Sequence, residues 1–307
     1  MGCSLRLVRM SVLGSIVLLA ACAQEPRQVT VCHDASLSAF IQSASERFQS
    51  NHPGIRVASR SQGSLQALRQ MEEGDCDLMA TADWRLIERF MIPQRARRGT
   101  VFLGDEMVLA TAQPGELDTA EKQTRWKEEW PRLIFSESRS YGIADPDRSP
   151  AGYFAHLAWK LAEIHYRNPG LYRRFLNHFD QRWMRPQTSD LAASLEAGDL
   201  DFAFLYQSTA AQKGWNYVRF PSPVSLGESS QSDRYRQVFL EVEGVGDGRP
   251  FKVDGAPIRY GICALEGAVP ESEVLLEYLL SPQAADMAKR LGYASVPQKN
   301  IGAGNPE

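Results

Sequence analysis

Apolar and polar positions along the chain switch between the periods typical of strands and of helices. Three apolar, β-branched runs predict strands, at residues 28–32, 55–58 and 76–80. Two amphipathic stretches between them predict helices, at residues 37–50 and 65–71. This alternation of strand and helix predicts a parallel α/β sheet.

The remainder of the chain continues this pattern. Further strands are predicted at residues 106–111, 201–206 and 259–264. Further helices are predicted at residues 153–166, 191–197 and 271–291, the last broken at Ser281-Pro282. Residues 221–232 are rich in Ser, Pro and Gly and predict a loop. We expect the chain to pass between two lobes near residue 222.

The N-terminus has the pattern of an export signal. Arg6 and Arg9 precede an apolar run at residues 10–19, which is too short to span a bilayer. The following Leu19-Ala20-Ala21-Cys22 matches the bacterial lipobox, so we expect cleavage of residues 1–21 and a lipid on Cys22. A plain signal peptide with a chance cysteine is the alternative. We therefore expect a mature protein in the periplasm or at the cell surface, held to the membrane by lipid.

Composition and charge narrow the class of protein. The chain has 307 residues, of which 43% are hydrophobic and 23% charged, as in ordinary globular proteins. Its net charge of −3 argues against non-specific nucleic-acid binding, which depends on cationic side chains.

The mature chain keeps Cys32, Cys76 and Cys263 as thiols. In an oxidising compartment Cys32 and Cys76 are a candidate disulfide pair, with buried free thiols as the alternative. No Cys/His spacing predicts a metal site.

Small hydroxyl residues stand at three expected strand-to-helix turns: Asp34-Ala35-Ser36, Gly63-Ser64 and Ser149-Pro150-Ala151-Gly152. A helix N-terminus offers unpaired backbone N–H groups and a partial positive charge, and a serine hydroxyl adds a donor. Three such termini pointing at one place would bind an anion without Lys or Arg. The alternative is that each serine only caps its helix.

Catalytic motifs are missing from the sequence. It contains no G-x-S-x-G, no H-E-x-x-H and no P-loop. His33 stands so close to Asp34 and Ser36 that the three are poorly placed to form a catalytic triad. We therefore expect no catalytic residue and no cofactor.

Seven segments resemble motifs of one family of proteins. They are residues 34–37 (A-G-S-L), 63–71 (a serine turn and an R-Q-I helix), 77–83 (D-[IV]-L-A-S-A-D), 106–110 (the E-M-V-[IL]-A part of N-E-M-V-[IL]-A), 141–153 (G-[IF]-x-[DN]-P-[DN]-x-x-P-C-G-Y), 185–208 (R-P-x-x-x-D-L and G-E-I-D-Y-A-F-E-Y-R-S) and 257–262 (P-I-x-Y-G-I). Together they make the chain similar to the molybdate/tungstate-binding proteins of ABC importers, from about residue 30 to residue 300.

This resemblance implies a fold, a site and partners. The fold is the type II periplasmic-binding-protein fold, in which hinge strands join two α/β lobes across a cleft; lobe one would contain residues 27–108 and 221–307, and lobe two residues 109–220. The implied ligand-binding residues are Ser36 and Ser64 in lobe one, and Ser149, Ala151, Gly152 and Tyr206 in lobe two. The implied function is that of a monomeric receptor delivering molybdate or tungstate to an ABC permease and its ATPase, with metal present only inside the oxyanion.

Other functions remain open on the same sequence. The same scaffold also suits sulfate, phosphate, vanadate or a small organic anion, and an enzyme or a sensor lipoprotein is a further alternative.

Ser149 and Leu205 stand where the tungstate-binding branch has carboxylates, and Ala151 and Phe154 replace its Cys and Arg. With both carboxylates absent, we expect neutral donors around a tetrahedral anion.

Overall fold

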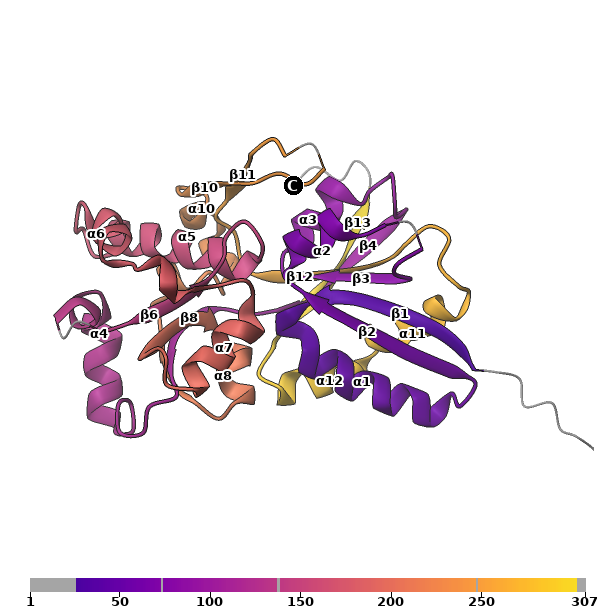
Figure 1. Cartoon of the computed structure of the whole chain (residues 1–307), viewed down its shortest axis with the longest axis horizontal. Coiled ribbons are helices and arrows are strands. Elements are labelled where there is room, and N and C mark those ends of the chain that lie inside the picture. The colour runs from indigo at the N-terminus through magenta and orange to yellow at the C-terminus, as the bar shows by residue number, and fades with distance from the viewer. Residues whose placement is uncertain (1–25, 73, 137–138, 247, 303–307) are drawn as a thin grey trace, which may run out of the picture.

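Two α/β lobes lie side by side in the computed structural model, each built around its own sheet (Figure 1). The structure describes residues 26–302 apart from residues 73, 137–138 and 247. The predicted export signal and Cys22 lie outside the described residues. Within the described part of the chain, none of the helices has the length and apolar character needed to cross a membrane.

Lobe one contains a six-stranded mixed sheet in the order β13-β4-β12-β3-β1-β2. Its strands are β1 (Arg27–Asp34), β2 (Ile55–Gln62), β3 (Leu78–Thr81), β4 (Arg98–Gly104), β12 (Arg259–Ala264) and β13 (Ala294–Gly302). Strand β1 runs parallel to β2 and β3, which confirms the parallel arrangement predicted for the first three strands. Strand β12 pairs antiparallel with β3 and β4, and β13 pairs antiparallel with β4.

Helices cover both faces of this sheet (Figure 1). They are η1 (Ala35–Leu37), α1 (Ser38–Asn51), α2 (Ser64–Gln70), α3 (Trp84–Phe90), α11 (Glu271–Leu279) and α12 (Pro282–Arg290). Helix α1 buries Phe40, Ile41, Ala44 and Phe48 completely, the face that its apolar spacing predicts. The break between α11 and α12 falls at Ser281, which caps α12 by accepting a bond from the Ala284 N–H.

Lobe two contains a five-stranded sheet in the order β7-β6-β8-β5-β9. Its strands are β5 (Met107–Thr111), β6 (Tyr141–Ala144), β7 (Met184–Arg185), β8 (Phe202–Tyr206) and β9 (Asn216–Arg219). Around it pack α4 (Ala120–Ser136), α5 (Pro150–His165), α6 (Leu171–His178), η2 (Gln181–Trp183), α7 (Thr188–Glu196) and α8 (Gln207–Gln212). Strands β5, β6 and β8 are buried along their whole length, because helices cover both faces.

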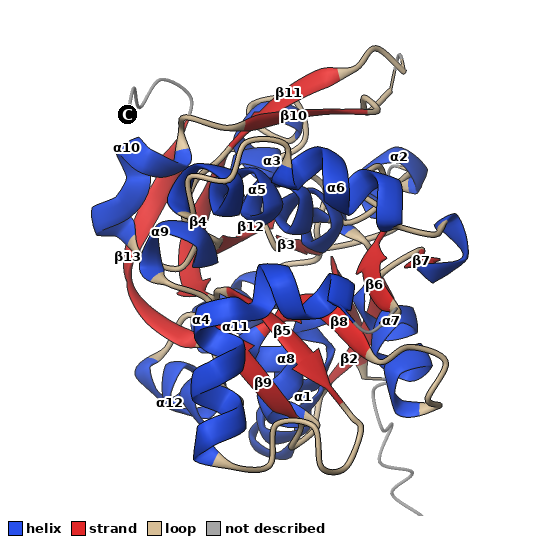
Figure 2. Cartoon of the chain, turned by 90° about the vertical axis from the view of Figure 1, so that its left-hand side faces the viewer, coloured by secondary structure: helices blue, strands red, loops and turns tan. Residues whose placement is uncertain are grey.

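The chain crosses between the sheets twice. Residues 105–106 join β4 to β5, and residues 220–258 return from β9 to β12. The return segment contains short helices within the stretch predicted as a loop, and then a two-stranded hairpin. These are α9 (Ser222–Ser225), η3 (Ser229–Gln231), α10 (Ser232–Tyr235), β10 (Phe239–Val242) and β11 (Phe251–Asp254). Figure 2 shows the hairpin lying along one edge of the molecule, beyond α5.

The cysteines settle an alternative that the sequence leaves open. Cys32 in β1 and Cys76 just before β3 form a disulfide, with Cα atoms 5.8 Å apart. Adjacent parallel pairing of β1 with β3 brings the two residues together. Cys263 in β12 is a buried free cysteine.

Candidate functional site

The first serine turn follows β1 directly. Asp34, the last residue of β1, is fully buried and caps the helical turn that starts at Ala35. Its Oδ1 accepts hydrogen bonds from the Ser36 backbone N–H (3.0 Å) and from the Ser36 hydroxyl (2.7 Å). The polar groups of Ser36 therefore point back at the end of β1.

The second serine turn follows β2 and meets the same carboxylate. The Ser64 N–H (3.0 Å) and the Ser64 hydroxyl (2.6 Å) both donate to Oδ2 of Asp34. The parallel register of β1 and β2 sets Asp34 opposite Gln62, so the two turns leave the sheet next to each other. The structure thus brings Ser36 and Ser64 together, as the resemblance implies. Their common acceptor, however, is the Asp34 carboxylate and not a bound solute.

Asp34 is the residue that the sequence analysis passed over. The sequence places it in a turn and in a poorly placed catalytic triad, yet it receives four hydrogen bonds from two helix starts. A usable signal was present, since Asp34 stands at the alanine of the A-G-S-L motif. A change from alanine to a carboxylate at a helix N-terminus introduces an anion where the backbone donors converge.

Lobe two contacts the second serine turn closely. The backbone N–H groups of Leu65 and Gln66 donate to the Arg148 carbonyl oxygen, at 3.1 and 3.2 Å. A Cβ added at Gly63 would collide with that carbonyl and would lie 3.2 Å from the Cβ of Ser149. The lobes therefore touch here, and Gly63 allows the close approach.

Ser149, Ala151 and Gly152 lie at the start of α5, where the sequence places them. Ser149 is the N-cap of α5 but makes no side-chain cap bond, so it does not act as the ordinary capping serine. Its hydroxyl is buried and has no hydrogen-bond partner among the described residues. The N–H groups of Ser149 and Gly152 are already bonded, to the carbonyls of Asp145 and Ser149. The hydroxyl of Ser149 is therefore a donor that this turn still offers.

Tyr206 ends β8, and its side chain lies near the carboxylates of Asp34, Asp83 and Asp105. Its side chain is fully buried, and its hydroxyl has no partner within the described part of the chain. Burial raises the pKa of Tyr206 well above its usual value, and the charges of Asp34, Asp105 and Asp83 raise it further. The hydroxyl is therefore a proton donor at all physiological pH values, close to three carboxylates.

Asp105 lies in the first crossing between the lobes. Its carboxylate accepts bonds from the backbone N–H groups of Glu106 (2.9 Å) and Ser208 (3.2 Å). The Tyr260 hydroxyl lies 3.2 Å both from Oδ2 of Asp105 and from Oγ of Ser36. Burial is the main cause that raises the pKa of Asp105 from 3.8 to about 7. Tyr260 thus connects the crossing segment to the first serine turn.

Comparison with known proteins assigns the chain to a family. The family model for bacterial extracellular solute-binding proteins matches residues 29–294. This chain belongs to that family. The type II periplasmic-binding fold predicted from the sequence is confirmed, as is the resemblance on which it was based.

Several named relatives of this solute-binding protein bind oxyanions. The molybdate/tungstate-binding protein WtpA of Pyrococcus abyssi is 28% identical over 282 residues, which cover 83% of this chain and 80% of the relative. The periplasmic molybdate-binding protein of Azotobacter vinelandii superposes with a TM-score of 0.61 at 15% identity, over 88% of this chain and 99% of the other. The sulfate-binding protein SubI of Mycobacterium tuberculosis superposes with a TM-score of 0.60 at 12% identity, over 88% and 87%. The two structural likenesses establish the fold.

Leu205 occupies a different environment from the one that the motif comparison implies. Its fully buried side chain packs in a small apolar cluster with Val108, Leu191 and Leu195. Residues alternate along β8, so Leu205 points to the opposite face from Tyr206. The position next to Tyr206 therefore has an apolar structural role in this solute-binding protein.

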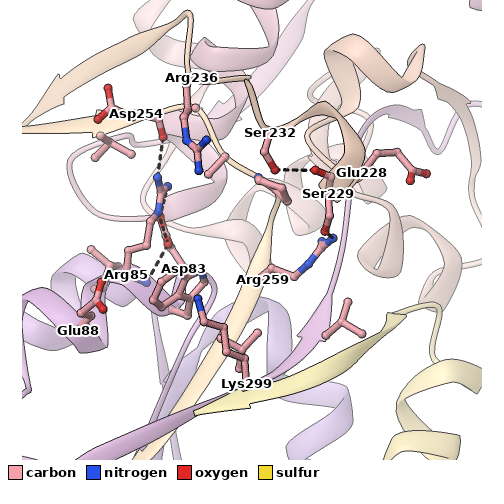
Figure 3. A pocket seen from close by; sticks show the side chains of 18 of the residues that line it. Asp83, Arg85, Glu88, Glu228, Ser229, Ser232, Arg236, Asp254, Arg259 and Lys299 are labelled. Carbon is pink, nitrogen blue, oxygen red and sulfur yellow. Dashed lines mark hydrogen bonds and ion pairs between the residues drawn. The ribbon is translucent and has the colours of Figure 1, made fainter. Parts of the chain in front are cut away.

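A cavity lies beside this group of buried polar residues. It measures about 1200 Å³ and is open to solvent. Asp83, whose carboxylate lies near Tyr206, also lines it. Several cationic side chains project into it: Arg85 of α3, Arg236 just after α10, Arg259 of β12 and Lys299 of β13 (Figure 3). Arg85 bonds both carboxylate oxygens of Asp83, and Arg259 donates to the Ser229 hydroxyl. We place the candidate anion site at the serine turns instead, because the buried hydroxyls of Ser149 and Tyr206 have no partner among the described residues.

The described residues form no cluster of side chains suited to binding a metal ion. No group of three or more His, Cys, Asp or Glu side chains is arranged there to hold one. The carboxylates of Asp34, Asp83 and Asp105 each bind protein donors instead.

Proposed function

We propose that this chain is the receptor of an ABC importer and that its solute is an oxyanion of the molybdate/tungstate class. Membership of an extracellular solute-binding family supports the receptor role. The names of relatives such as WtpA support the solute class. In this proposal the protein binds its solute without transforming it, and passes it to permease and ATPase subunits.

The convergence of four donors on one anionic group is the observation that carries the proposal. Ser36 and Ser64 each give one N–H and one O–H to the Asp34 carboxylate, over 2.6 to 3.0 Å. Backbone and hydroxyl donors fixed at helix starts stabilise negatively charged oxygens without a cation. The two serine turns therefore form an arrangement suited to the oxygens of an oxyanion.

Lobe two supplies the other half of the proposed site. The buried hydroxyls of Ser149 and Tyr206 have no partner among the described residues, and a buried hydroxyl without a partner is unfavourable. An oxyanion between the lobes would accept hydrogen bonds from both. With a neutral hydroxyl at Ser149 and an apolar Leu205 facing away, we propose tetrahedral coordination.

Calorimetric titration tests this function. The mature protein is titrated with molybdate, tungstate, sulfate and phosphate, and we expect binding of the first two. Ser149→Ala removes a buried hydroxyl that has no partner among the described residues, so it should weaken binding by roughly 1.5–3 kcal/mol, the typical contribution of a hydrogen bond to a charged group. Ser45→Ala is the matched control, because the Ser45 hydroxyl is likewise buried without a partner among the described residues, but lies in α1. Absence of heat with every anion, from protein shown to be folded, refutes the proposal.

We further propose that Cys22 carries the lipid anchor. The lipobox in the sequence supports this, and Cys22 lies outside the described residues. Expression of the full chain followed by membrane fractionation tests it: the wild type should partition with membranes and Cys22→Ser should be recovered in the soluble fraction. Equal partitioning of the two proteins argues against lipidation.

A further inference from the structure

The two serine turns are fully engaged by the chain itself. Each Asp34 carboxylate oxygen accepts one N–H and one O–H, Oδ1 from Ser36 and Oδ2 from Ser64. A carboxylate can accept about four hydrogen bonds, so Asp34 has its full set. The side chain is completely buried, and none of the salt bridges found in the described residues involves it. Asp34 thus has the hydrogen-bond environment of a bound anion.

The serine hydroxyls have no second proton to offer a solute. The Ser64 Oγ accepts a bond from the Ala82 N–H (3.1 Å), and the Ser36 Oγ lies 3.2 Å from the Tyr260 hydroxyl. A hydroxyl carries a single proton, and in both serines it is directed at Asp34. A solute oxyanion at these turns cannot share the donors with Asp34 and has to replace it.

Electrostatics leads to the same conclusion. An oxyanion placed beside an ionised Asp34 would bring like charges together in a buried environment, where their repulsion is weakly screened. Arg85 is already paired with Asp83, at 2.6 Å. Occupation of the turns by Asp34 and by the solute is therefore mutually exclusive.

We propose that Asp34 is a tethered anion that occupies the oxyanion position, so that the solute binds only by displacing it. This inference rests on the proposed function and deepens it, because it makes Asp34 the residue that sets the affinity. A competitor attached to the site acts at a high effective concentration and lowers the apparent affinity of every free anion. Only a solute that also uses the unpartnered hydroxyls of Ser149 and Tyr206 gains contacts that Asp34 does not make.

Asp34→Ala removes the competitor and leaves the donors in place. We expect molybdate and tungstate to bind Asp34→Ala at least tenfold more tightly than the wild type, since each donor freed for a charged acceptor is worth about tenfold or more. Asp201→Ala is the matched control, because Asp201 holds Ser140 by the same pair of N–H and O–H bonds, both 2.8 Å, in lobe two. Its affinity should equal that of the wild type.

Loss of the carboxylate leaves four buried donors without an acceptor, so Asp34→Ala should also be less stable. Two measurements keep the test valid. Asp34→Asn retains the side-chain volume and one acceptor oxygen, and its affinity should lie between those of wild type and Asp34→Ala. In thermal unfolding, added molybdate should raise the Tm of Asp34→Ala more than that of the wild type.

The outcomes separate the inference from the function. Tighter binding by Asp34→Ala supports the tethered anion. Binding by this variant alone, with none by the wild type, also supports it and overturns molybdate or tungstate as the natural solute. Equal affinity in wild type and variant overturns the inference and leaves the proposed function standing. No binding by any folded variant overturns the proposed function itself.

Discussion

Asp105 is the residue through which we expect pH to act on the stability of this protein. It is 3% exposed and lies where the chain crosses from β4 to β5. Burial raises the pKa of its carboxyl from 3.8 to about 7, more than the opposing hydrogen bonds from Ser208, Glu106 and Tyr260 lower it. In the unfolded chain the same group ionises near its ordinary value. The folded state therefore binds more protons than the unfolded state between these two values.

The sign and size of the effect follow from proton linkage. Where the folded state binds the extra proton, the free energy of unfolding falls as pH rises. A difference of roughly three pKa units corresponds to about 4 kcal/mol at 1.36 kcal/mol per unit. The contribution of Asp105 is fully present below about pH 4 and is lost as pH rises through about 7. Between pH 5 and pH 8 this residue should lower stability by about 3 kcal/mol.

Urea unfolding of wild type and Asp105→Asn at pH 5 and pH 8 measures this contribution. Asparagine keeps an acceptor oxygen for the N–H groups of Glu106 and Ser208 but does not ionise. Other groups titrate in both proteins, so the relevant quantity is the difference between the two pH dependences. The variant should gain about 3 kcal/mol relative to wild type on going from pH 5 to pH 8. Parallel pH profiles for the two proteins would show that the buried carboxyl does not titrate as we infer.

Three further substitutions test other parts of the structure. Cys76→Ala removes the bond to Cys32 across a separation of 44 residues and should lower the free energy of unfolding by about 4 kcal/mol in denaturant titrations; a reductant should lower wild-type stability equally and leave the variant unchanged. Arg69→Met removes bonds from α2 to the carbonyl oxygens of Asp147 and Glu243, so small-angle scattering should show a larger radius of gyration; an unchanged radius would mean that other contacts hold the lobes together. Leu205→Glu places an unpaired carboxylate in an apolar cluster and should destabilise the fold by about 3 kcal/mol or more in thermal unfolding; tighter tungstate binding without loss of stability would contradict this placement.

Elements with a strong apolar period could be predicted from the sequence alone. Helix α1 and strands β1, β5, β8 and β12 appear close to their predicted positions, because burial on one or both faces imposes a clear pattern. Strand β13 was not predicted, and most of its residues are exposed. It exists because it pairs with β4 at the edge of the sheet, a contact that leaves no periodic signal in the sequence.

Some residues of the candidate site could be predicted from the sequence, and one could not. The sequence identified the turns that carry Ser36, Ser64 and Ser149, because small hydroxyl residues at helix starts are a local feature. Its apolar pattern also placed Tyr206 at the end of a predicted strand, residues 201–206. It missed Asp34 as the acceptor of the serine donors, because an aspartate in a turn has the local pattern of an ordinary capping residue, and only its departure from the A-G-S-L motif indicated a further role.

The sequence by itself determined the fold class of this protein, since the order of strands and helices and the spacing of apolar residues are encoded locally. The tertiary structure decided which groups meet. Asp34 receives bonds from both serine turns because the parallel register of β1 and β2 sets Asp34 opposite Gln62. The disulfide between Cys32 and Cys76 likewise depends on the pairing of β1 with β3. The bonds from Ser64 to Asp34 and from Cys32 to Cys76 join residues 30 and 44 positions apart, and they exist only when long-range strand pairing has fixed the chain in space.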